Sequence, residues 1–113
     1  MSLTKAQVTK IVLSLPLTEE STSYGYPSFK TNGKFLTRLR SEDASLVLYV
    51  ASRDERDHLI EMDPETFHIT PHYKNYPTVL ARIAKLDAKT LRHMLDLRWR
   101  QCVPKKLLSD NRR

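Results

Sequence analysis

An Asn-Gly pair in the first third of this 113-residue chain constrains the fold more than any other feature. Asn32 and Gly33 separate two runs that carry apolar and β-branched side chains, residues 28–31 and 34–40. Because both residues tolerate a positive φ angle, such a pair is a strong signal for a two-residue hairpin turn. The sequence therefore predicts an antiparallel hairpin over residues 28–40.

Counting outward from this turn gives the register of the two strands. We expect three cross-strand pairs, which are Thr31 with Lys34, Lys30 with Phe35, and Phe29 with Leu36. Alternation then groups the side chains on two faces, with Phe29, Leu36, Arg38 and Arg40 on one and Lys30, Phe35, Thr37 and Leu39 on the other. Both faces carry apolar side chains, so one face is either partly covered or in contact with a partner. Lys30 and Lys34 flank the turn and make its tip cationic.

A second hairpin is expected over residues 66–83. Two runs, FHIT and TVLARI, flank a loop bounded by Pro71 and Pro77. Both runs alternate with a period of two, which indicates strands with one buried face. The inward set is Phe67, Ile69, Val79, Ala81 and Ile83, and the opposite set is His68, Thr70, Thr78, Leu80 and Arg82. The loop gathers rings and a cation, in His72, Tyr73, Lys74 and Tyr76, and its composition suits contact with a ligand.

The remaining elements are three helices and one strand. Capping patterns and apolar residues at helical spacing predict helices over residues 4–15, 52–62 and 87–102. The run 45–50 predicts a strand, whereas residues 18–27 are interpreted as a connecting segment. We expect Trp99 in the core, because it lies on the apolar stripe of the third helix with Leu91, Met94, Leu95 and Cys102. The order α-β-β-β-α-β-β-α predicts an α+β two-layer sandwich with a five-stranded, largely antiparallel sheet.

Composition narrows the class of protein. The chain has the size of one domain, residues 1–113. No apolar run approaches the ~20 residues that span a bilayer, so we expect a cytoplasmic protein without membrane contact. The single Cys102 excludes an internal disulfide and a cysteine-rich zinc site. The four histidines lack metal-ligand spacing, and there is no Gly-rich phosphate loop. We therefore expect no metal, no cofactor and no enzymatic activity.

Charge is distributed unevenly along the chain, which carries +6 in total. Residues 1–50 hold six Lys/Arg and four Asp/Glu (+2), residues 51–65 hold two and six (−4), and residues 66–113 hold eleven and three (+8). The last part includes a basic tail from about residue 104, with Lys105, Lys106, Arg112 and Arg113. Such polarity favours nucleic acid or an anionic surface as a partner, and the alternative is that the cations only keep a small domain in solution.

Four stretches together resemble the MmcQ/YjbR-like family, namely TSYGYPSFKTNGKFLTRL, DPETF, ITPHYKNYPTVLARI and LRWRQCVPKKLL. They occur in this order over nearly the whole chain. The resemblance implies a compact α+β domain similar to secretion-chaperone folds. It also implies DNA binding by a double wing, in which two hairpins project from the sheet. By position, Lys30, Asn32, Gly33 and Lys34 match one wing, and His72, Tyr73, Lys74, Asn75 and Tyr76 match the other.

Nucleic-acid binding is therefore the first hypothesis. In it Lys30, Lys34 and Lys74 neutralise phosphates, and Tyr73 or Tyr76 packs on a sugar or base. The full set of candidate residues is Lys30, Lys34, Arg38, Arg40, His72, Tyr73, Lys74, Tyr76 and Arg82. Phosphate contacts are sensitive to salt and carry no sequence information, so we expect weak or no sequence specificity.

Two other classes of function remain open. A protein-interaction or chaperone-like module would use the partly apolar sheet face, with a protein partner or a second copy of the chain as a homodimer. Binding through that face would be insensitive to salt. An enzyme is the third class, and it is disfavoured because Cys102 lies on an apolar stripe, where thiols are usually unreactive.

Overall fold

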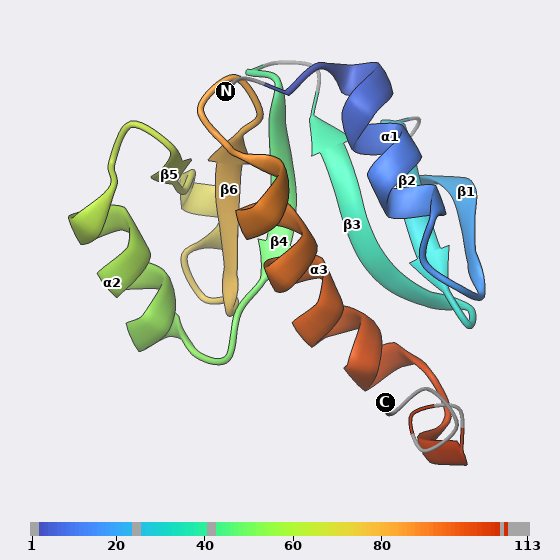
Figure 1. The fold of residues 1–113 in the computed structure, drawn as a ribbon. Coiled ribbons are helices and arrows are strands. Elements are labelled where there is room, and N and C mark those ends of the chain that lie inside the picture. Colours follow the sequence, from blue (N-terminus) through green and yellow to red (C-terminus); the bar gives the residue numbers. More distant parts are fainter. Residues whose placement is uncertain (1–2, 24–25, 41–42, 107, 109–113) are drawn as a thin grey trace.

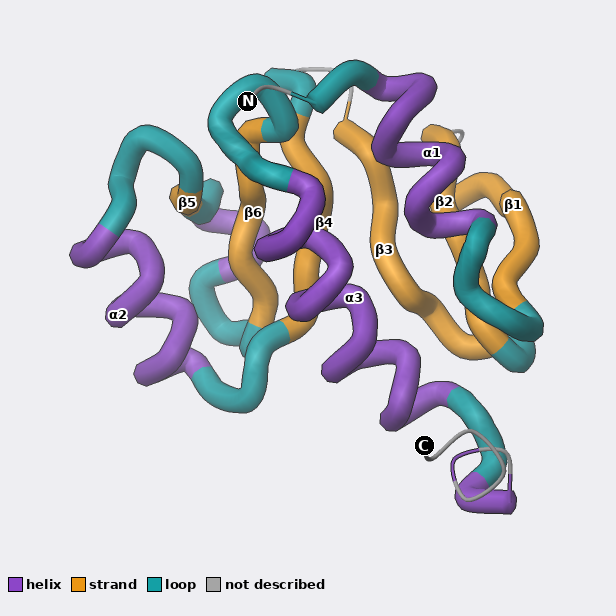
Figure 2. Tube along the Cα trace, in the orientation of Figure 1, coloured by secondary structure: helices purple, strands orange, loops and turns teal. Residues whose placement is uncertain are grey.

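The computed structural model describes residues 3–23, 26–40, 43–106 and 108. The helices of the described part are α1 (Lys5–Leu13), α2 (Arg53–Met62) and α3 (Ala88–Cys102). The strands are β1 (Thr18–Ser23), β2 (Tyr26–Thr31), β3 (Lys34–Arg40), β4 (Ser45–Tyr49), β5 (Phe67–His68) and β6 (Thr78–Arg82). A single 3₁₀ turn, η1 (Pro71–Tyr73), lies between β5 and β6. Figures 1 and 2 show α1 and α3 lying across one face of the sheet, with α2 beside β5.

The strands form one antiparallel sheet in the order β1-β2-β3-β4-β6-β5. The predicted α+β class and antiparallel sheet are confirmed, with six strands in place of five. The additional strand is β1, from the segment expected to be a connection. Its sequence, TEESTS, has no apolar alternation, because it is an edge strand whose Glu19 and Glu20 are exposed. It pairs with β2 over its whole length, and the hydroxyls of Thr18 and Thr31 lie 2.7 Å apart.

The first hairpin forms at the predicted turn. Asn32 and Gly33 have φ angles of 53° and 78°, the two positive values of a type I′ turn. Two of the predicted pairs are confirmed, Thr31 with Lys34 and Lys30 with Phe35. The third is wrong, because the register shifts by one residue and Phe29 pairs with Thr37.

This β-bulge changes which side chains of β3 share a face. The prediction grouped Leu36 with Arg38 and Arg40 and placed Leu39 on the opposite face. In the structure Leu36 and Leu39 both join Phe29 in the main core, whereas Phe35 packs with a separate cluster on the other face. Counting residues from the turn fails at the bulge, because one extra residue reverses the alternation beyond it.

The three helices begin at the predicted caps. The Thr4 hydroxyl accepts a hydrogen bond from the Gln7 amide N–H, and the Gln7 side chain accepts one from Thr4 in return, which completes a capping box. Ser52 and Asp87 accept from the N–H groups of Glu55 and Thr90 at the starts of α2 and α3. The predicted apolar stripe of α3 is buried throughout, and Trp99 is a core residue, as predicted.

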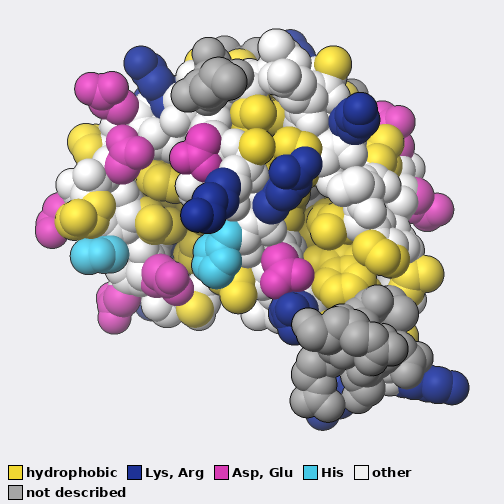
Figure 3. Space-filling model, in the orientation of Figure 1, with side chains coloured by type: hydrophobic (Ala, Val, Ile, Leu, Met, Phe, Trp, Pro, Cys, Tyr) yellow, Lys and Arg dark blue, Asp and Glu magenta, His cyan; other side chains and the backbone are white. Residues whose placement is uncertain are grey.

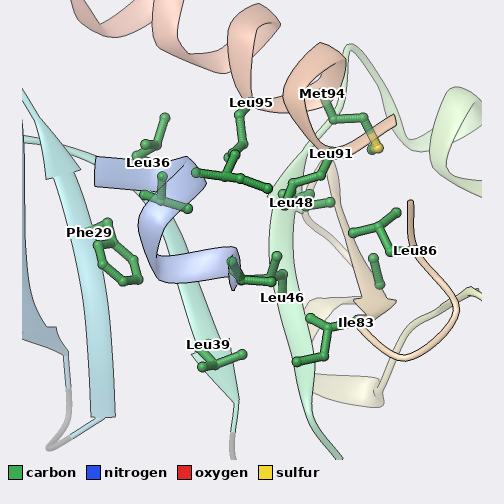
Figure 4. Close-up of a cluster of buried hydrophobic side chains, with 14 of the residues drawn as sticks. Phe29, Leu36, Leu39, Leu46, Leu48, Ile83, Leu86, Leu91, Met94 and Leu95 are labelled. Carbon is green, nitrogen blue, oxygen red and sulfur yellow. The ribbon is translucent and has the colours of Figure 1, made fainter. Parts of the chain in front are cut away.

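The core lies between the sheet and the helices α1 and α3. Figure 4 shows Leu36, Leu46 and Leu48 of the strands directed towards Leu91 and Leu95 of α3. On the second face of the sheet, Val47 and Leu80 are buried beneath Tyr73 of η1. Among the described residues, no helix combines the length and the apolar character needed to cross a membrane. In the predicted basic tail Lys105 and Lys106 are exposed, while Arg112 and Arg113 lie outside the described residues.

Candidate functional site

The connecting turns of the two predicted hairpins lie at the same end of the sheet. β3 begins at Lys34, β4 ends at Tyr49 and β6 begins at Thr78, and β4 lies between the other two strands. In the strand order only β4 separates the two hairpins, and Figure 1 shows β3 curving away from β4 towards the Asn32-Gly33 turn. We call residues 32–34 and 71–77 together the two-hairpin end.

The tip of the β2–β3 hairpin packs against the chain itself. The backbone N–H of Asn32 donates to the Leu17 carbonyl at 2.9 Å, and its side-chain Nδ2 donates to the Cys102 carbonyl at the end of α3 at 3.0 Å. Lys30 is half-buried opposite Glu19 of β1, whereas Lys34 is exposed. Of the two predicted phosphate-binding lysines of this hairpin, Lys34 is thus the one that faces solvent.

The loop before β6 is held by a side chain from α2. The Arg56 side chain is buried, and its Nη1 donates to the carbonyls of Tyr73, Lys74 and Tyr76 at 3.2, 2.8 and 3.1 Å. A charged donor makes stronger hydrogen bonds than a neutral one, so this one guanidinium fixes the path of the loop. Tyr73 is buried on the second face of the sheet, and its hydroxyl accepts from Arg38 Nη2 at 2.6 Å.

The same loop presents rings and a cation to solvent. His72, Lys74 and Tyr76 are exposed, and Tyr76 retains 54% of its possible exposure. The rings of His72 and Tyr76 lie 6.3 Å apart between centroids and are inclined by 31°. Exposed rings beside a cation can stack on bases and contact phosphate, which is the usual combination in single-strand binding.

The three predicted arginines lie on the second face of the sheet, Arg38 and Arg40 on β3 and Arg82 on β6, with β4 between the two strands. Arg38 bonds to Tyr73, and Arg40 Nε lies 3.4 Å from Asp43 Oδ1. Arg82 donates to the carbonyls of Pro64 and Glu65 at 3.2 and 3.0 Å. All three are half-buried, so each has a role in holding the fold. Their contact with nucleic acid stays a prediction, as does that of Tyr73.

A polar cluster surrounds His68 on this face. Its Nε2 lies 3.0 Å from the Ser45 hydroxyl and 3.6 Å from Asp43 Oδ2. Burial and the charge of Arg82 lower the pKa of His68, Asp43 raises it, and Arg40 lowers it further. A catalytic triad needs the serine and the carboxylate on opposite ring nitrogens, but here both contact Nε2. The cluster is therefore an electrostatic contact between strands.

Two sets of contacts beside the candidate site are not predicted by the sequence, those of Arg56 and those of Arg98. Arg98 Nε donates to the Phe35 carbonyl at 3.0 Å, and its guanidinium lies 4.0 Å from the centre of the Tyr49 ring. Both arginines reach partners that are distant in the sequence, so no local pattern marks them. Acidic side chains gather over α2 (Figure 3), and those next to Arg56 in the sequence are typical of a helix start.

The second sheet face is less available to a protein partner than the sequence suggested. Its apolar residues Val47 and Leu80 are 2% and 0% exposed, because Tyr73 and Phe35 pack against them. The chain thus covers with its own loop the surface that the protein-interaction hypothesis requires. Within the described residues there is no group of three or more His, Cys, Asp or Glu side chains arranged to hold a metal ion.

Comparison with known proteins gives a family and relatives. The family model described as YjbR matches residues 13–101. The uncharacterized protein Mb2600 of Mycobacterium bovis is 30% identical over 115 residues, covering 89% of this chain and 89% of that protein. The uncharacterized proteins MT2646 and Rv2570 of Mycobacterium tuberculosis match with the same identity and coverage. No solved structure matches the chain.

Proposed function

We propose that this chain, which belongs to the YjbR family, binds DNA through exposed residues of its two-hairpin end. The observation that carries the proposal is the position of the two hairpins on either side of β4. Lys34 on one hairpin and Lys74 on the other are both exposed, and neither makes an ion pair within the described part of the chain. Cations on both hairpins can each neutralise a phosphate of one bound strand.

The rings of the second loop favour unpaired bases over a closed duplex. Tyr76 and His72 are exposed side by side, whereas Tyr73 is occupied by the sheet. A base can stack on an exposed ring only when it leaves its own stack, so a single-stranded segment meets this surface at lower cost. Phosphate contacts position the strand without reading bases, and we therefore expect weak sequence specificity.

The acidic start of α2 bounds this surface on one side. Asp54, Glu55 and Asp57 are exposed, and they lie on the helix whose Arg56 reaches beneath the loop. A polyanion is repelled by these carboxylates and attracted by Lys34, so it should run from Lys74 towards the first hairpin and not over α2. The proposal also includes the cytoplasmic location expected from the sequence, because the protein must have access to DNA.

The test compares salt-dependent DNA binding by matched charge variants. We expect the double variant Lys34→Ala with Lys74→Ala to lose affinity for labelled single strands and duplexes in fluorescence anisotropy. The slope of log affinity against log salt should flatten by about 0.7 for each single-strand phosphate contact removed and about 0.9 for each duplex contact. Adding Lys30→Ala should have a smaller effect, because Lys30 is half-buried opposite Glu19.

The matched control removes the same kind of charge from the opposite end of the sheet. Lys5 and Lys89 are exposed near the starts of α1 and α3 and, like Lys34 and Lys74, make no ion pair among the described residues. Their replacement by Ala should leave the salt slope unchanged. Equal losses in the control and the two-hairpin variant would reduce the proposal to general charge attraction, and a wild-type protein without salt-sensitive DNA binding would refute it.

Stacking is tested separately from charge. Tyr76→Ala should weaken single-strand binding by about 1–3 kcal/mol, the usual contribution of one base–aromatic contact. Tyr76→Phe keeps the ring and should bind like the wild type. If both substitutions leave affinity unchanged, Tyr76 takes no part in binding and the lysines act alone.

A further inference from the structure

A groove of about 340 Å³ lies between α1 and α3, away from the two-hairpin end. The side chains that matter for its chemistry are Leu3, Gln7, Lys10, Ile11, Ala88 and Arg92. The Leu3 N–H donates to the carbonyl of Ile83, and Ala88 is the first residue of α3, so the groove is near the end where β6 finishes. Its volume is in the range of small-molecule sites.

Two cations face this groove from different helices. Lys10 of α1 and Arg92 of α3 are exposed, and neither makes an ion pair within the described ranges. No Asp or Glu belongs to the described lining of the groove. Figure 3 shows Lys and Arg side chains over α3, with hydrophobic surface nearby. Two like charges on one small groove repel each other, and an anion between them removes that repulsion.

The polar group of Gln7 adds a donor to the same groove. Its Oε1 accepts from the Thr4 N–H at 2.9 Å in the capping box of α1, which fixes the orientation of the amide. The Nε2 group, a donor, is what remains for a ligand. The N-terminus of α3 contributes less, because the Asp87 carboxylate already accepts from the Thr90 N–H there. The side chains of Gln7, Lys10 and Arg92 therefore define the site.

We propose that this groove binds a phosphorylated small molecule. The phosphate lies between Lys10 and Arg92, where the planar guanidinium matches two phosphate oxygens and the ammonium adds a point charge. A phosphate carries up to two negative charges and therefore matches two cations better than a carboxylate does. The apolar side chains Leu3, Ile11 and Ala88 give the remainder of the ligand a surface to pack against. This inference does not depend on the DNA-binding proposal, because it concerns another surface.

The test is a titration followed by amide NMR with defined probes. Adenosine 5′-monophosphate should cause saturable shifts of α1 and α3 amides, and adenosine should cause none. Inorganic phosphate should shift the same amides with weaker affinity, because it lacks a part that contacts Leu3 and Ile11. Arg92→Gln and Lys10→Gln should each weaken binding of the monophosphate by about tenfold or more, the effect of losing one charged hydrogen bond.

The matched control is Lys89→Gln, which removes an exposed cation of α3 that does not line the groove. It should change the affinity by less than about twofold, as a surface substitution does. The proposal is overturned if Lys89→Gln weakens binding as much as Arg92→Gln, if adenosine binds as well as its monophosphate, or if none of the phosphate probes gives saturable shifts. Shifts of these amides by an oligonucleotide alone would assign the groove to nucleic acid and overturn it as well.

Discussion

The two hairpins at one end of this sheet are held by different means. The β2–β3 hairpin turns in two residues whose own φ angles, 53° and 78°, determine its shape. The connection from β5 to β6 is longer, and its path is set by Arg56, which lies on α2 and donates to three of its carbonyls. The first is thus built from local backbone preference, and the second depends on one buried cation from elsewhere in the chain.

The comparison shows how an exposed loop can be ordered and still present its side chains. In the longer loop the backbone carbonyls face inward to Arg56, so His72, Lys74 and Tyr76 face outward. In the short turn a side chain also faces the protein, because the Asn32 amide donates to the Cys102 carbonyl. A ligand therefore meets more side chains on the loop than on the turn.

The largest effect should come from removing the cation under the loop. We expect Arg56→Ala to lower the free energy of unfolding by about 2–3 kcal/mol, because three carbonyls lose a charged donor. Urea denaturation measures this loss. Arg53→Ala, at an exposed position of the same helix, is the control and should change stability by less than about 0.5 kcal/mol. Equal stability of both variants would mean that the loop does not need Arg56.

The turn should be sensitive to backbone strain and not to side-chain volume. Gly33 has a φ of +78°, and no atom lies within 4 Å of the position of an added Cβ. Gly33→Val should therefore cost about 1–2 kcal/mol through strain alone. Gly33→Asn, which tolerates positive φ, should cost clearly less in the same thermal unfolding experiment. If the two variants melt together, φ does not control this turn.

A smaller effect is expected from the hydroxyl that joins the loop to the sheet. Tyr73→Phe keeps the ring over Val47 and Leu80 but removes the acceptor of the Arg38 hydrogen bond. We expect a loss of about 1 kcal/mol in the free energy of unfolding. Tyr76→Phe removes an exposed hydroxyl from the same loop and should have no effect, so a comparable loss in both variants would contradict this assignment.

The smallest effect concerns the pH dependence of stability. Burial, with the charge of Arg82, holds the pKa of His68 below its ordinary value of 6.5. The unfolded chain therefore binds a proton more readily than the folded chain, so stability should fall as the pH drops below about 6.5. His68→Gln should flatten the curve of unfolding free energy against pH in this window. Parallel curves for wild type and variant would show that His68 does not contribute.

Local signals in the sequence predicted most of the fold and only part of the candidate site. The caps at Thr4, Ser52 and Asp87 and the Asn32-Gly33 turn act within a few residues, so the sequence shows them directly. The bulge beside Leu36 could not be predicted, because it places both Leu36 and Leu39 in a core made by other elements.

In the candidate site, too, only the features that depend on local sequence could be predicted. The exposure of Lys34, Lys74 and Tyr76 agrees with their place at predicted turns and loops. The burial of Tyr73 and the contacts of Arg56 depend on residues far along the chain, and residue type alone does not distinguish Tyr73 from Tyr76. Spacing in the sequence therefore found the loop but not which of its tyrosines faces solvent.

The strand missing from the predicted sheet also affects how the protein behaves at high concentration. β1 forms one margin of the sheet, where unpaired backbone groups invite a strand from another molecule. Glu19 and Glu20 place two exposed carboxylates along that margin, and β5 limits the opposite margin to two residues. The β1 edges of two molecules carry the same charge and repel each other. The polar sequence that made β1 difficult to predict therefore protects the sheet from edge-to-edge aggregation.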